Sequence, residues 1–215
     1  MTIAFHPDIS TLMAFSAGTL EEPYAVVVAT HTAMCEGCRE QLKRLDTIGG
    51  AVLASSSESR MSDGALDRLL AAADDRIDVP PKHGRRGDDL PAPLASVLPG
   101  GFESARWRWS GPGVSVADLP VSKGAEGRLM LLKVAGGRRV PEHSHGGQEL
   151  TLILKGAYND RFGRFGAGDI ADHDEDVEHQ PVAEMGEDCI CLVAVDAKLS
   201  FSSRLIRALQ PIFGL

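Results

Sequence analysis

Two histidines and a glutamate stand close together in the second half of the chain, at a spacing suited to metal binding. His143, His145 and Glu149 follow the pattern H-x-H-x3-E, which is framed by Gly137 and Gly156. Neutral imidazoles and one carboxylate form a ligand set that first-row metals prefer. If the segment is a strand, the two histidines point to the same face. We therefore predict a metal site here rather than a set of polar residues on a surface hairpin.

A fourth candidate ligand lies farther along the chain. The apolar run LTLIL predicts a strand that carries Glu149 at its start. His179 follows a Gly-Asp turn at Gly168 and Asp169, and it completes the predicted set of His143, His145, Glu149 and His179. His173 stands among acidic residues, and we interpret it as a solvent-exposed turn residue, with a ligand role as the lesser alternative.

A second metal-binding pattern lies near the N-terminus. His31, Cys35 and Cys38 follow H-x3-C-x2-C, a spacing that places them on one face of a helix or at a helix end. A tetrahedral zinc site needs a fourth ligand, and His6 is the other histidine that precedes His83. The alternative is a helix with two buried thiols and a partly exposed histidine. We favour zinc at His6, His31, Cys35 and Cys38, because a structural metal contributes much to the stability of a small domain.

Hydrophobic periodicity divides the chain into a helical part and a β-rich part. Helices are expected to begin near Pro7, at Glu22-Pro23, at Glu36 and near Asp63. Short strands separated by turns follow from Leu94, as in an antiparallel sandwich or barrel. The predicted fold class is α + β with two domains. Its parts are a small helical zinc-binding domain at 1–80, a linker at 81–93, a β domain at 94–197 and an apolar tail at 198–215.

Two further pairs of residues are assigned to packing. Cys189 and Cys191 share one face of the last long strand, and we interpret them as buried small apolar groups rather than a redox pair. Trp107 and Trp109 alternate with arginines and are expected to pack against the sheet. Neither pair is assigned a chemical role.

Composition limits the classes of function. The chain has 215 residues, a net charge of −8 and no basic block, which argues against direct binding of nucleic acid. It contains no apolar run long enough to span a membrane, and its first residues lack the pattern of a signal peptide. We therefore expect a cytoplasmic protein without a membrane partner, whose four cysteines are thiols or metal ligands.

The metal-binding patterns carry a resemblance to known families. The first cupin motif, G-x5-H-x-H-x3-E-x6-G, is met in full by Gly137, His143, His145, Glu149 and Gly156. The second, G-x5-P-x-G-x2-H-x3-N, is met at Gly168 and His179, while Asp174, Asp176 and Ala183 replace its Pro, Gly and Asn. A helical domain with an upstream histidine and H-x3-C-x2-C, followed by a cupin, resembles the ChrR family of zinc-binding bacterial anti-sigma factors.

The resemblance implies a regulator rather than an enzyme. Its N-terminal domain would bind and inhibit an extracytoplasmic-function sigma factor in a 1:1 heterodimer, and two zinc ions per chain would be expected. The cupin would be required for a response to singlet oxygen or organic peroxide. The alternative is a metal-dependent cupin dioxygenase or isomerase with a helical appendage, whose histidines and glutamate would hold Fe or Mn with an open position. A co-purifying sigma factor would favour the first hypothesis, and iron with turnover of a small molecule the second.

Overall fold

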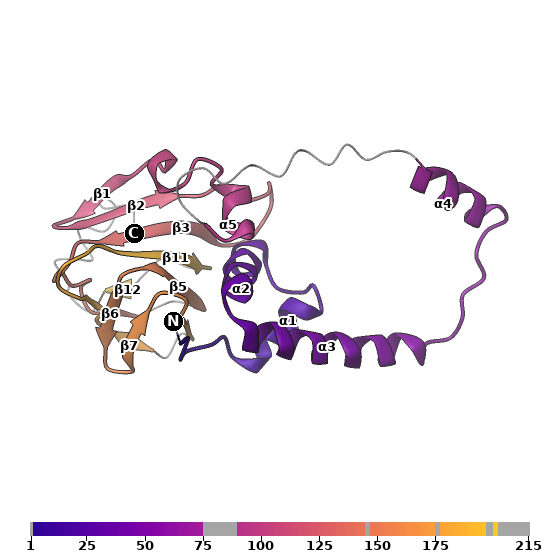
Figure 1. Cartoon of the computed structure of the whole chain (residues 1–215), viewed down its shortest axis with the longest axis horizontal. Helices are drawn as coiled ribbons and strands as arrows, with labels where there is room; N and C mark the ends of the chain where they lie inside the picture. Colours follow the sequence, from indigo (N-terminus) through magenta and orange to yellow (C-terminus); the bar gives the residue numbers. More distant parts are fainter. Residues whose placement is uncertain (1, 75–89, 145–146, 175–176, 197–199, 202–215) are drawn as a thin grey trace.

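The computed structural model describes residues 2–74, 90–144, 147–174, 177–196 and 200–201 (Figure 1). Helices dominate the first of these ranges and strands the others. The helices are α1 (Ile9–Ser16), α2 (Glu22–Met34), α3 (Glu36–Ala54), α4 (Ala65–Asp74) and α5 (Ala92–Val97), with a single 3-10 turn η1 (Phe102–Ser104).

The strands are short and pair in antiparallel fashion. They are β1 (Arg108–Gly111), β2 (Val114–Asp118), β3 (Arg128–Val134), β4 (His143–Ser144), β5 (Glu149–Lys155), β6 (Ala157–Asp160), β7 (Gly163–Gly166), β8 (Ile170–His173), β9 (Glu178–His179), β10 (Val182–Ala183), β11 (Cys189–Val195) and β12 (Ser200–Phe201). Among the described residues, six strands form one sheet in the order β1-β2-β3-β11-β5-β8, and two three-stranded sheets have the orders β10-β6-β7 and β12-β4-β9. The predicted α + β class is confirmed.

The central strands β5 and β11 are buried on both faces. One face of the large sheet, including Leu152 and Leu192, packs with Val27 and Val28 of α2. The other face, including Cys191 and Val193, packs inside the β domain against the smaller sheets. Two-sided burial explains why these strands read as continuous apolar runs rather than as alternating patterns. The helix α2 thus lies directly on the outer face of the sheet, beside α5 (Figure 1).

The segment before α1 also packs on the β domain. The Phe5 ring stacks on Phe165 at 4.2 Å between centroids, and the backbone N–H groups of Ala4 and Phe5 donate to Asp169 Oδ1 at 2.7 and 3.0 Å. Gly168 has φ +94°, and a Cβ there would lie 2.8 Å from the side chain of Ile3. A turn of this shape at so close an approach requires glycine. The N-terminal residues are therefore anchored to the turn between β7 and β8.

The predicted domain boundaries remain predictions, since most of the predicted linker and tail lie outside the described residues. Strand β12 pairs with β4 at the start of the predicted tail. Helix α4 stands away from the rest of the described chain (Figure 1). None of the helices within the described ranges is long and apolar enough to cross a membrane.

The structure confirms one predicted tryptophan contact and corrects the other. Trp107 packs against the core, where its Nε1–H donates to the Phe102 carbonyl at 3.2 Å and the Lys133 ammonium lies 4.5 Å from its ring. Trp109 is 63% exposed, so its predicted packing is wrong. Strand β1 pairs with β2 and forms an edge of the large sheet, and the side chain of Trp109 on this strand lies largely in solvent.

Candidate metal centres

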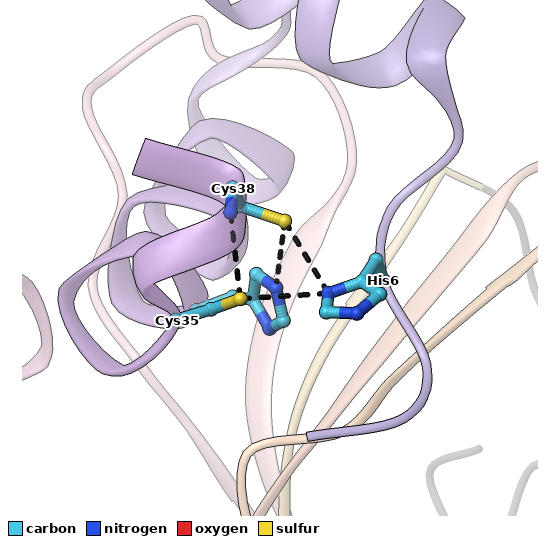
Figure 2. A group of neighbouring side chains, drawn as sticks. His6, Cys35 and Cys38 are labelled. Atoms are coloured by element: carbon cyan, nitrogen blue, oxygen red, sulfur yellow. Dashed lines mark hydrogen bonds between the residues drawn. The ribbon is translucent and has the colours of Figure 1, made fainter. Parts of the chain in front are cut away.

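The first centre is assembled where α2 ends and α3 begins. His31 lies in the last turn of α2, and Cys38 lies in the first turn of α3. Cys35 stands between the helices with φ −108° and ψ 112°, so it ends α2 and caps the N-terminus of α3. The predicted spacing therefore belongs to a helix end rather than to one continuous helix. His6 reaches the same point from the segment that precedes α1 (Figure 2).

The four donor atoms lie at distances suited to one metal ion. His31 Nε2 lies 3.2 Å from Cys38 Sγ, and His6 Nδ1 lies 3.5 Å from both Cys35 Sγ and Cys38 Sγ (Figure 2). All four donors lie within 4.8 Å of one another. A zinc ion with bonds of about 2.0 Å to nitrogen and about 2.3 Å to sulfur sets tetrahedral edges of about 3.3 to 3.8 Å. The group is thus a possible His/Cys metal-binding site whose donor set fits zinc.

The surroundings of His31 and Cys38 determine their protonation states. His31 is fully buried, and its Nδ1–H donates to the Gly168 carbonyl at 2.9 Å, which leaves Nε2 to face the thiols. Burial lowers the pKa of His31 to about 4, so the imidazole is neutral at pH 7. Burial, followed by the neighbouring Cys35, raises the pKa of the Cys38 thiol. A divalent cation reverses that effect by favouring the thiolate, as does the positive end of α3.

The second centre lies within the β domain, on β4, β5 and β9. His143 on β4 pairs in register with His179 on β9, and their ring centroids are 4.7 Å apart. Glu149 begins β5, and all three side chains are buried. Predicted ligand His145 lies outside the described residues. The three described members of the predicted set line one cavity. Of these three, His179 alone belongs to a described group of donor atoms within 4.8 Å of one another, and its companions there are Asp160 and His173. The placement of His145 stays a prediction.

Hydrogen bonds fix the orientation of these side chains. His143 Nδ1–H donates to the Pro141 carbonyl at 2.7 Å, and His179 Nδ1 lies 3.1 Å from Asp160 Oδ2. Each contact engages Nδ1, as outer partners of ligand histidines do, so Nε2 would be the nitrogen that binds a metal. The Thr151 hydroxyl donates to Glu149 Oε1 at 2.9 Å. This donor set suits a first-row metal, including zinc.

Asp160 was not recognised from the sequence. Burial alone would raise its pKa, but the hydrogen bonds from His179 and the Phe162 amide hold the pKa below its ordinary value. The carboxylate is therefore charged at neutral pH and is a strong acceptor for His179. No sequence motif marks the residue, because it lies on β6 and meets His179 only through the fold.

His173 corrects an interpretation made from the sequence. The sequence predicts a solvent-exposed turn residue, with a ligand role as the lesser alternative, but His173 ends β8 and is only 7% exposed. Its ring centroid lies 4.9 Å from that of His179. Strand β8 is the neighbour of β5 in the large sheet, so the side chain faces the same interior as Glu149, with which it pairs in register.

A small apolar cavity of about 50 Å³ lies beneath the second centre, with Glu149 and His179 in its wall. Cys189 and Cys191 also line it, with their sulfur atoms 3.7 Å apart. Both thiols are buried, as predicted. The hydrogen bond with Cys189, followed by burial, raises the pKa of Cys191, so this thiol is protonated at neutral pH.

Comparison with known proteins supports the cupin and extends the resemblance to the whole chain. A family model described as the ChrR cupin-like domain matches residues 100–198. The chain is 45% identical to the anti-sigma-E factor ChrR of Cereibacter sphaeroides over 215 residues, which is all of both proteins. It also matches the crystal structure of Rhodobacter sphaeroides SigE in complex with the anti-sigma ChrR. That match has a TM-score of 0.79 and 43% identity, and it covers 91% of this chain and 100% of the other. The chain therefore belongs to the ChrR family of anti-sigma factors.

Proposed function

We propose that this protein inhibits transcription by binding an extracytoplasmic-function sigma factor in a 1:1 complex in the cytoplasm. The observations that carry the proposal are the match over the whole chain to an anti-sigma factor and the match over 91% of the chain to an anti-sigma factor solved in complex with SigE. The predicted alternative, a cupin dioxygenase or isomerase, is set aside because the full-length relative is a regulator and not an enzyme.

Apolar surface on the outer helices supports a protein partner. Leu66, Leu69 and Leu70 of α4 are 61%, 65% and 56% exposed, and Val52 and Leu53 of α3 are 64% and 76% exposed. Large exposed side chains gathered on two helices are typical of a binding surface. The net charge of −8 complements the basic DNA-contacting face expected of a sigma factor, and it would favour encounter with that face.

Zinc at the His/Cys centre would hold this surface in place. The donors come from the start of the chain, the end of α2 and the start of α3, so one ion would join three segments. Loss of the ion would free α3 from α2 and alter the position of its apolar face. We propose a second zinc in the cupin, held by His143, His145, Glu149 and His179.

We further propose that the cupin senses singlet oxygen or organic peroxide and that its change reaches the helices through β8. One end of this strand follows Gly168 and Asp169, which bond to His31 and to the N-terminal segment. The other end is His173, opposite Glu149 of the cupin centre. A displacement of β8 would thus move groups at both centres, which makes the strand a candidate two-state element.

The proposal is tested by co-expressing the chain with the extracytoplasmic-function sigma factors of its own organism. We expect one sigma factor to co-purify at equal molar amount. The variants Cys35→Ser and Cys38→Ser should lose bound zinc and most of the complex, because three ligands hold zinc more weakly than four. Cys189→Ala is the matched control, since it also removes a buried thiol but should retain both. Full complex formation by the two serine variants would contradict the role of zinc.

A further inference from the structure

A cluster of possible metal ligands in the β domain includes a residue that the cupin pattern does not contain. One donor atom from each of Asp160, His173 and His179 lies within 4.8 Å of the other two. His179 belongs to the second cupin motif, whereas His173 falls at a position that the motif leaves unspecified. His173 ends β8 directly opposite Glu149, another residue of the motif. Two neighbours of His173 are thus expected ligands.

The imidazole of His173 has an unsatisfied nitrogen. Its side chain is 7% exposed, and among the described residues its Nε2 has no hydrogen-bond partner. The centroid of the Phe162 ring lies 5.1 Å from that of the His173 ring. The His179 ring lies edge-on to the His173 ring, at an interplanar angle of 83°. A buried polar nitrogen without a partner is destabilising, so such groups are normally satisfied by protein, water or an ion.

A metal ion would satisfy this nitrogen, because a neutral imidazole offers one nitrogen lone pair to a metal. Asp160 is a weaker candidate for direct ligation, since its Oδ2 is already engaged by His179 Nδ1. Asp160 therefore orients His179 from behind.

We propose that His173 is an additional ligand of the cupin metal centre, beyond the ligands of the cupin motifs. The inference rests on the proposed cupin metal. The ion would be held by an extra nitrogen from β8, and its coordination number would exceed that given by the motif ligands alone. Because His173 lies on the strand that also contacts the N-terminal segment, this bond would link the metal to β8.

Cobalt substitution of the full-length protein tests the inference without relying on regulation. Cobalt bound to the His/Cys centre has a sulfur-to-metal charge-transfer band in the near ultraviolet, and the visible bands report the coordination number of the cobalt ions. We expect His173→Ala and His173→Phe to keep the charge-transfer band and to change the visible bands. Their cupin centre should bind cobalt at least about tenfold more weakly than the wild type. The retained band shows that the variants are folded.

Two further variants serve as controls. His179→Ala removes a motif ligand and should abolish the cupin bands, whereas Phe162→Leu changes a neighbour of His173 without removing a nitrogen and should leave them intact. Unchanged visible bands and affinity in both His173 variants would overturn the proposal and leave His173 as a core residue. If the wild-type cupin takes up no metal at all, the proposed cupin centre itself is wrong, and this outcome is separate from the first.

Discussion

Asp169 joins the N-terminal segment to the cupin, and its replacement by asparagine gives the sharpest test of that contact. The carboxylate is buried and accepts three backbone N–H bonds. Ala4 and Phe5 donate to Oδ1 at 2.7 and 3.0 Å, and Gly166 donates to Oδ2 at 2.8 Å. Phe5 directly precedes His6, so the same contact places a ligand of the His/Cys centre.

The expected loss follows from these bonds. In Asp169→Asn the amide oxygen still accepts from Ala4 and Phe5, but without the charge that strengthens both bonds. The amide NH2 then faces the Gly166 N–H, so a buried donor loses its partner. Weakening two charge-assisted bonds and leaving one donor unpaired amounts to about 2–4 kcal/mol of unfolding free energy. Zinc affinity should fall about tenfold or more, as it does when groups that position a ligand are removed.

Urea unfolding of the zinc-loaded protein and zinc competition with a chelator measure the two effects. Asp118→Asn is the matched control, because Asp118 also accepts two bonds, from Arg108 and Arg128, but lies half-exposed at the surface. Its substitution should lower the unfolding free energy by no more than about 1 kcal/mol. An Asp169→Asn variant that stays within about 0.5 kcal/mol of the wild type and binds zinc equally well would show that this contact does not position His6.

Three further outcomes are expected. Leu69→Asp with Leu70→Asp should weaken sigma-factor binding at least about tenfold with an unchanged melting temperature, because both side chains are more than half exposed; unchanged affinity by titration calorimetry would exclude α4 from the interface. Asp160→Asn should lower cupin metal affinity about 10–100-fold, since His179 loses its charged acceptor; equal affinity in competition assays would remove Asp160 from that role. In the metal-free chain, the pKa of His31 is about 4 when folded and about 6.5 when unfolded. The neutral form of His31 therefore contributes its whole share of the unfolding free energy above pH 6.5, and about 3 kcal/mol of that free energy is lost as the pH drops toward 4. Urea midpoints between pH 7 and 4 measure this loss, and an equal loss in His31→Gln would assign it to other groups.

Local signals were sufficient to predict helices α1 to α4 and the glycine-framed motif. The strands expected from Leu94 begin only at Arg108, because α5 and η1 occupy the first part of that stretch. Pro23 stands in the first turn of α2, and Cys35 adopts the extended conformation that separates α2 from α3. Gly137 and Gly156 have φ of +74° and +71°, which explains why glycine stands at both ends of the motif. Such features depend on neighbouring residues, and the sequence displays them directly.

Long-range contacts could not be predicted in the same way. The burial of His173 depends on β8 pairing with β5, and the acidic residues around it suggested a solvent-exposed turn instead. Asp169 was recognised only as part of a turn, because its partners Ala4 and Phe5 lie at the other end of the chain. The packing of α2 on the large sheet was missed for the same reason, since two-sided burial of β5 and β11 is a property of the assembled fold.

Transcription in a purified system measures whether the chain inhibits its sigma factor. The purified, zinc-loaded chain is titrated into a reaction that contains the co-purifying sigma factor, core RNA polymerase and a promoter for that sigma factor. We expect transcription to stop at one chain per sigma factor and to be restored by prior removal of zinc or by the substitution Cys38→Ser. Transcription that continues undiminished at a molar excess of the folded, zinc-loaded chain would contradict the proposed inhibition.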